Sequence, residues 1–169
     1  DFSAGQVGID MPAYKNDGFE LLRGHAHFEG EILGGCIDTF FDMFDGTRYA
    51  DMPDVIRRYG LFPAAEAWRG KILLLESSEE QPSPEKYRRA LEYLRDAGVF
   101  AAVSGVLVGK PMDDLHHAAY KQALLEVIPG TELPIVCNLS VGHAQPRGIL
   151  PLGVHATVDA DAQRITFAY

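Results

Sequence analysis

The sequence predicts a single α/β domain with a mixed, largely parallel sheet. Three apolar runs, residues 71–76, 100–108 and 134–139, lack any alternation of polar and apolar residues, as strands buried on both faces do. Segments with helical spacing separate these runs, and this order of strands and helices is typical of right-handed crossovers in a parallel sheet. Residues 154–158 and 164–168 flank a polar turn and predict a closing hairpin, which adds antiparallel strands.

The elements before the first buried strand follow from local signals. Residues 19–23 are predicted to be extended. Residues 30–36 contain three glycines, and we expect them to form a loop. The phenylalanines of residues 37–44 recur at helical spacing, which predicts a short helix. A further helical turn is expected over residues 51–59, with Gly60 closing it.

Two amphipathic helices connect the buried strands. The first has a strong start signal, because Ser83 is a good N-cap and Pro84 suits the first helical position. Its apolar stripe continues to Leu94, and Gly98 is expected to end it. The second helix is predicted from about residue 113 to residue 128.

The start of the chain differs in composition from the rest. Residues 1–18 are polar, rich in glycine and without periodicity, so we expect a linker or tail followed by one domain over residues 19–169. The chain begins with Asp1 rather than Met, and we expect it to be a piece of a longer protein. It shows no signal peptide, which favours the cytoplasm.

The composition excludes several classes of protein. Of 169 residues, 47% are hydrophobic and 23% charged, which excludes a disordered chain. No apolar run approaches the roughly 20 residues of a membrane span. The net charge is −9, so neither nucleic acid nor a membrane is an expected partner. Cys36 and Cys137 are far apart and belong to no CxxC pair, which favours buried free thiols.

Two chemically active residues follow the predicted buried strands. Glu76 ends the first of these strands, and His143 follows the third. Since the carboxyl ends of parallel strands meet at one edge of a sheet, these two side chains could lie close together. A carboxylate that orients a histidine forms two thirds of a nucleophile-activating triad. The alternatives are an ion-paired Glu76 and a His143 bonded to backbone.

No nucleophile accompanies this pair. None of the six serines lies in a nucleophile elbow, and Ser140, three residues before His143, gives only a weak signal. Apolar surroundings raise the pKa of a thiol, which argues against Cys36 and Cys137 as nucleophiles. A metal-dependent hydrolase that uses His25, His27 and His143 is a third alternative, with Glu29 as a further ligand. We expect neither a metal nor a cofactor.

Taken together, several motifs resemble the LD-carboxypeptidase family of serine peptidases, which includes the microcin C immunity proteins. The resemblance covers roughly residues 22–158, and the motifs occur in family order. They are Gly34-Gly35-Cys36, Asp45-Gly46-Thr47-Arg48-Tyr49, Gly70-Lys71-Ile72-Leu73-Leu74-Leu75-Glu76, Ser104-Gly105-Val106-Leu107-Val108-Gly109-Lys110-Pro111, Gly142-His143-Ala144-Gln145-Pro146 and Leu150-Pro151-Leu152-Gly153.

The resemblance implies a two-domain enzyme. Its N-terminal domain carries the nucleophilic serine, and its C-terminal domain, a swivelling β/β/α-type domain, supplies the glutamate and histidine of a Ser-His-Glu triad. By motif these two residues are Glu76 and His143. The nucleophile domain is absent from this sequence, so we expect residues 1–18 to be the former linker. The chain alone is then expected to be inactive, with its own N-terminal domain as partner.

The resemblance also implies two branches of substrate. Murein-recycling members remove a terminal D-alanine from a tetrapeptide, whereas immunity-type members cleave an amide between an aminoacyl group and a nucleotide-like group. Cys36 replaces the family's usual asparagine near the substrate, and Trp68 could stack on a base, although packing is the alternative. Family members are homodimers, which predicts the same here. A stand-alone, non-catalytic binding domain of the same fold is the alternative function.

Overall fold

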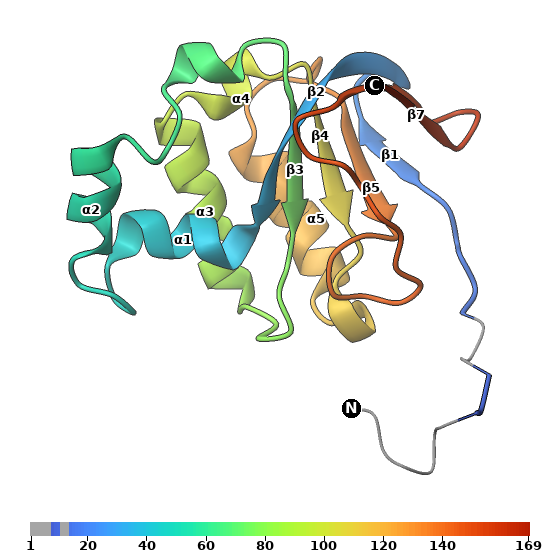
Figure 1. Ribbon diagram of the computed structural model, residues 1–169, viewed down its shortest axis with the longest axis horizontal. Helices are drawn as coiled ribbons and strands as arrows, with labels where there is room; N and C mark the ends of the chain where they lie inside the picture. Colours follow the sequence, from blue (N-terminus) through green and yellow to red (C-terminus); the bar gives the residue numbers. More distant parts are fainter. Residues whose placement is uncertain (1–7, 11–13) are drawn as a thin grey trace.

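A computed structural model describes residues 8–10 and 14–169, so ten of the eighteen residues of the predicted linker or tail lie outside the described residues. In the described part, seven strands form one curled sheet in the order β1-β5-β4-β3-β2-β6-β7 (Figure 1). The strands are β1 (Glu20–Arg23), β2 (His27–Cys36), β3 (Ile72–Glu76), β4 (Gly105–Gly109), β5 (Ile135–Leu139), β6 (His155–Asp159) and β7 (Arg164–Ala168).

The centre of the sheet is parallel, as predicted. Strands β2, β3, β4 and β5 pair in parallel, and the crossovers between β3, β4 and β5 contain α3 and α5. Strand β1 pairs antiparallel with β5 at one edge, and the predicted hairpin β6–β7 pairs antiparallel with β2 at the other. The expected α/β fold with a mixed sheet is therefore confirmed, although only three of the six strand pairings in the described residues are parallel.

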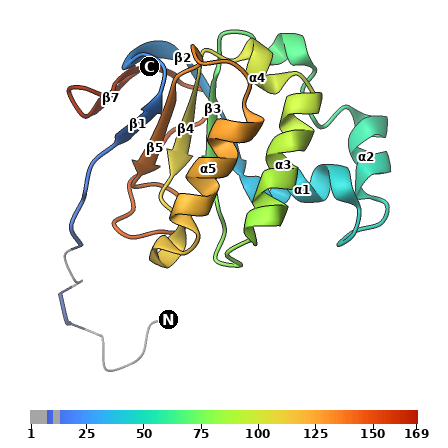
Figure 2. The same cartoon turned by 180° about the vertical axis from the view of Figure 1, so that it is seen from behind.

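The helices cover one face of the sheet. Figure 2 shows α3 and α5 lying in front of the strands when the molecule is seen from behind. The helices are α1 (Ile37–Asp45), α2 (Met52–Tyr59), α3 (Pro84–Asp96), α4 (Val99–Ala102) and α5 (His117–Val127), with 3-10 turns at Ala65–Trp68 and Met112–Asp114. The N-cap of α3 is as predicted, because Ser83 Oγ accepts a hydrogen bond of 3.2 Å from the Lys86 N–H.

Two apolar clusters hold the layers together. Alternate residues of a strand point to opposite faces, so Leu73 and Leu75 pack with the helices, whereas Ile72 and Leu74 pack on the other face. All four are buried, which explains why the sequence of β3 shows no alternation. On the second face the cover comes from the curled end of the sheet, where Val158 of β6 joins the cluster.

The expected loop at residues 30–36 is wrong, because this segment is the second half of strand β2. The first half of β2 pairs with β6, and residues 32–36 pair with β3. Its glycines allow a close approach of neighbouring backbone, since a Cβ at Gly34 would lie 2.1 Å from the Leu74 carbonyl oxygen. Strand pairing with two neighbours thus overrides the weak strand preference of glycine.

Two predicted boundaries also require correction. Residues 99–102 form α4 rather than the start of a strand, and β4 begins at Gly105. Ser104 lies between the end of α4 and the start of β4. Its N–H donates a hydrogen bond to Lys71 O, and its hydroxyl donates one to Glu29 O. The helix predicted from residue 113 begins at His117 instead, since Asp113, Asp114 and His116 have positive φ angles that a right-handed helix excludes.

Candidate active site

Glu76 and His143 meet at the carboxyl edge of the parallel strands. Glu76 ends β3, and His143 lies in the loop that follows β5. The Nδ1 atom of His143 lies 2.8 Å from Oε2 of Glu76. The carboxylate is mostly buried, with 13% of its side chain exposed, whereas the imidazole is 35% exposed. The structure thus joins the two residues that the strand-end argument selected.

The loop after β5 is shaped to bring the imidazole to this carboxylate. Gly142 has a φ of +83°, and a Cβ there would lie 2.5 Å from Oε2 of Glu76 and 2.8 Å from its Cβ. Only glycine fits this position without strain. Two hydrogen bonds hold the loop backbone, from Gly148 N–H to Ser140 O at 2.6 Å and from Arg147 Nη2 to His143 O at 2.9 Å.

A second carboxylate contacts the other ring nitrogen. Oε2 of Glu79 lies 3.0 Å from Nε2 of His143, and the Glu79 side chain is 66% exposed. The imidazole therefore lies between the mostly buried carboxylate of Glu76 and the exposed carboxylate of Glu79. Glu79 is not among the site residues predicted from the sequence. The available signal was an acidic residue only three positions beyond the strand end at Glu76.

Cys36 lies beside Glu76, because the two residues are register partners in the parallel pair β2–β3. Its Sγ atom is 3.6 Å from Oδ2 of Asp38. Burial raises the pKa of the Cys36 thiol to about 11, and the charge of Glu76 adds to the effect. A thiol with this pKa is neutral near pH 7, which agrees with the expectation that Cys36 is no nucleophile.

Asp38 organises the segment that follows Glu76. This buried residue of α1 accepts a hydrogen bond of 3.1 Å from the Ser78 N–H through Oδ2. Its other oxygen forms an ion pair with Lys86, whose Nζ atom is 3.2 Å away. The Ser78 hydroxyl in turn accepts a hydrogen bond from the Glu80 N–H. These contacts fix the backbone that carries Glu79.

The structure places Trp68 in the core, which corrects its predicted role as a platform for a base. The residue is 1% exposed and belongs to the apolar cluster on the helical face. Its Nε1 atom donates a hydrogen bond of 3.2 Å to Pro63 O, and its ring packs against Phe62. Packing, the alternative interpretation, therefore accounts for Trp68.

No serine of the described residues forms a hydrogen bond with His143. Ser77 and Ser78 are buried, Ser83 caps α3, and Ser104 bonds backbone carbonyls. Ser140 donates a hydrogen bond of 3.2 Å to Asn16 Oδ1. Ser3 lies outside the described residues. The pair of Glu76 and His143 thus has no serine partner in this part of the chain.

A pocket of about 400 Å³ opens beside His143. Its walls include two cations, Lys110 and Arg147, and two carboxylates, Asp113 and Asp114. Lys110 is largely buried, and its Nζ atom lies 3.5 Å from Asp114. Lys110 is thus already paired, whereas Arg147 forms no ion pair among the described residues and can bind a negatively charged group.

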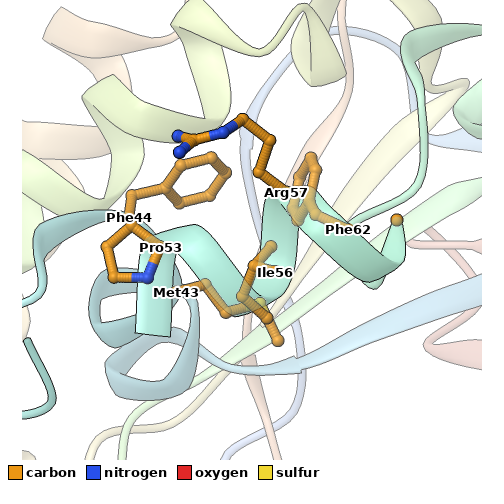
Figure 3. A pocket seen from close by; sticks show the side chains of 7 residues that line it. Met43, Phe44, Pro53, Ile56, Arg57 and Phe62 are labelled. Atoms are coloured by element: carbon orange, nitrogen blue, oxygen red, sulfur yellow. The ribbon is translucent and has the colours of Figure 1, made fainter. Parts of the chain in front are cut away.

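A second pocket, of about 410 Å³, lies between α1 and α2 (Figure 3). Met43, Phe44 and Ile56 give it apolar walls, and its single charged side chain, Arg57, already pairs with Asp54. Neither helix carries Glu76 or His143. This pocket therefore offers no acid–base pair.

The alternative of a metal-dependent hydrolase finds no support in the arrangement of the histidines. His27 pairs with Asp159 at 3.1 Å, whereas His143 pairs with the two glutamates. Within residues 8–10 and 14–169, no group of three or more His, Cys, Asp or Glu side chains could hold a metal ion. Across the same residues, every helix is too short or too polar to cross a bilayer.

Comparison with known proteins gives a family for this chain. The family model for the LD-carboxypeptidase C-terminal domain matches residues 29–158. The microcin C7 self-immunity protein MccF of Escherichia coli is 27% identical over 158 residues, which are 90% of this chain and 40% of that protein.

Solved structures of MccF and an MccF-like protein support the same family assignment. The MccF-like protein of Streptococcus pneumoniae, in complex with AMP, is 53% identical with a TM-score of 0.92, over 100% of this chain and 49% of that one. MccF in complex with glutamyl sulfamoyl guanosine, and an MccF active-site mutant with a serine, an asparagine and a lysine replaced by alanine, are each 25% identical. Both have a TM-score of 0.68 and cover 92% of this chain and 42% of theirs.

This chain thus spans less than half the length of the relatives it matches. The motifs that carry Glu76 and His143 lie inside the matched residues 29–158. The chain belongs to the LD-carboxypeptidase family and corresponds to the C-terminal domain of its members.

Proposed function

We propose that this chain supplies the general base and its orienting carboxylate to a serine hydrolase. The observation that carries the proposal is the 2.8 Å contact between Nδ1 of His143 and Oε2 of Glu76. A carboxylate at Nδ1 holds the imidazole in the tautomer whose Nε2 can accept a proton, and it stabilises the imidazolium that then forms. His143 is the base and Glu76 the orienting residue.

The nucleophile in this proposal comes from an N-terminal domain that the chain does not contain. The described serines make other contacts, and the MccF active-site mutant has a serine among its replaced residues. Completing the site with that serine would give a Ser-His-Glu triad. We therefore expect the 169-residue chain alone to be inactive, since a base without a nucleophile forms no acyl-enzyme.

The proposed reaction is the hydrolysis of an amide. The serine oxygen attacks the carbonyl carbon while its proton passes to Nε2 of His143. The C–N bond then breaks, and the leaving amine takes this proton. Water attacks the acyl-enzyme in the same manner, with His143 again accepting and returning the proton, which releases the acid and restores the serine.

Two observations favour an aminoacyl-nucleotide over a murein tetrapeptide as substrate. The first is that the Streptococcus pneumoniae relative is in complex with AMP and MccF with glutamyl sulfamoyl guanosine. The second is the pocket beside His143, whose lining includes Arg147; this side chain forms no ion pair among the described residues and would complement a phosphate or sulfamoyl group. Cys36, next to Glu76, is proposed to face the substrate, whereas Trp68 is no longer part of the site.

The test is amide hydrolysis by the full-length protein that contains this chain. An aminoacyl-sulfamoyl adenosine and a murein tetrapeptide are the two substrates. We expect activity on the first, with losses of about 10²- to 10⁴-fold in kcat for Glu76→Gln and His143→Ala. His155→Ala, an exposed histidine of β6, is the matched control and should retain activity. Full activity in His143→Ala would refute the proposed role of this residue.

The same measurements address the alternative of a non-catalytic binding domain. Binding of the sulfamoyl adenosine without hydrolysis by the full-length protein would favour that alternative. We also propose a homodimer, which sedimentation of the full-length protein tests, and a cytoplasmic location, which cell fractionation tests.

A further inference from the structure

The contact between Glu79 and His143 involves the nitrogen that the proposed reaction needs. Nδ1 is already bonded to Glu76, so proton transfer must use Nε2, where the Glu79 carboxylate lies at 3.0 Å. A nucleophile that approaches Nε2 must take this place. The Glu79 carboxylate then loses its partner, while its backbone stays fixed through Ser78 and Asp38.

Glu79 differs from its neighbour Glu80 in how its charge is compensated. Glu80 lies 3.2 Å from Arg48, so its charge already has a partner on the surface. In the part of the chain that the structure describes, the charged contact of Glu79 is His143. Displaced from Nε2, the Glu79 carboxylate would face the reacting atoms as an uncompensated negative charge. It would then attract a cation carried by the substrate.

We propose that Glu79 binds the α-ammonium group of an aminoacyl substrate and so selects aminoacyl over peptidyl acyl groups. This inference rests on the proposed function. In the reaction the nucleophile lies between Nε2 and the carbonyl carbon, and the α-carbon with its amino group is bonded to that carbon. A free α-amino group is charged near pH 7. The α-ammonium group of the bound substrate therefore lies close to the Glu79 carboxylate, which the nucleophile has displaced from Nε2.

The two classes of substrate differ in the charge on the nitrogen next to the scissile carbonyl group. An aminoacyl-nucleotide has a free α-ammonium group beside the scissile carbonyl. An acyl group whose α-nitrogen is itself in an amide, as within a peptide, has no charge at that atom. A carboxylate contributes a charge-assisted hydrogen bond only to the first of these. Glu79 would thus favour a free amino terminus.

The experiment compares one substrate with its N-acetyl derivative in the full-length protein. An aminoacyl-sulfamoyl adenosine and its N-acetylated form are hydrolysed by the wild type, by Glu79→Gln and by Glu80→Gln as the neighbouring control. We expect the wild type and Glu80→Gln to prefer the free amine by about 10- to 100-fold in kcat/KM. Glu79→Gln should lose most of this preference and retain activity on the N-acetylated form.

The alternative outcomes are distinguishable. Equal losses on both substrates in Glu79→Gln would show that Glu79 only positions His143, and would overturn the inference. Calorimetry can measure the binding of the free and the N-acetylated compound to a full-length variant without the nucleophilic serine, where no hydrolysis occurs. If Glu79→Gln leaves the preference for the free amine unchanged in this binding measurement, the inference is overturned. Hydrolysis that survives Glu76→Gln and His143→Ala would instead refute the proposed function, whatever Glu79 does.

Discussion

Replacing Gly142 by alanine should lower the free energy of unfolding and disturb the contact between Glu76 and His143. The structure gives the size of the loss in stability. The residue has a φ of +83°, which costs a residue with a Cβ about 1–2 kcal/mol. The new Cβ would also lie 2.8 Å from Cβ of Glu76, so the strand end or the loop must shift. Losing the Glu76–His143 hydrogen bond adds about 1 kcal/mol. The expected total is about 2–3 kcal/mol.

Urea unfolding of the 169-residue chain measures this cost. Gly130→Ala is the matched control, because Gly130 has a φ of +74° and open space around a Cβ. With a slope of about 2 kcal/mol per molar urea, the midpoint should fall by about 1–1.5 M for Gly142→Ala and by about 0.5–1 M for Gly130→Ala. Equal shifts in the two variants would refute the argument that Gly142 is required by its contact with Glu76.

Two further predictions concern Cys36, the register partner of Glu76, and Asp38, which holds the segment that follows Glu76. Alkylation of Cys36 should be slow at pH 8 and accelerate as the pH rises toward about 11, because burial raises the pKa of this thiol and only the thiolate reacts. Peptide mass spectrometry distinguishes the alkylation of Cys36 from that of Cys137. Rapid alkylation of Cys36 at pH 8 would contradict the burial argument. Asp38→Asn should lower the free energy of unfolding by about 1–3 kcal/mol, since it removes the charge paired with Lys86. Asp161→Asn, at an exposed position, is the control. Equal effects of the two substitutions in urea unfolding would contradict the role of Asp38.

The parts of the fold that the sequence predicted are those with local signals. Uninterrupted apolar runs marked β3 and β5, and the cap at Ser83 marked α3. Strand β2 could not be predicted in the same way, because its glycines are tolerated through pairing with strands that are distant in the sequence. The start of α5 was missed because its preceding residues adopt positive φ angles that composition does not reveal.

The candidate site shows the same division. The contact of Glu76 with His143 followed from a general rule, that parallel strands bring their carboxyl ends to one edge. The contact of Glu79 depends on how the loop after β3 turns, and that turn is set by Asp38 on another element. Trp68 was misplaced because an aromatic residue in a polar segment gives no sign of which face it occupies.

The pairing of β2 with β6 also has a consequence for how this chain is synthesised. Residue 28 pairs with residue 158, so one half of β2 stays without its partner until the C-terminal hairpin has left the ribosome. During that interval the apolar face completed by Ala156 and Val158 remains open. Folding that depends on such distant contacts is slow, and an unpaired strand edge invites association with other chains. A nascent chain stalled before β6 should therefore be a strong client for chaperones that hold exposed strands.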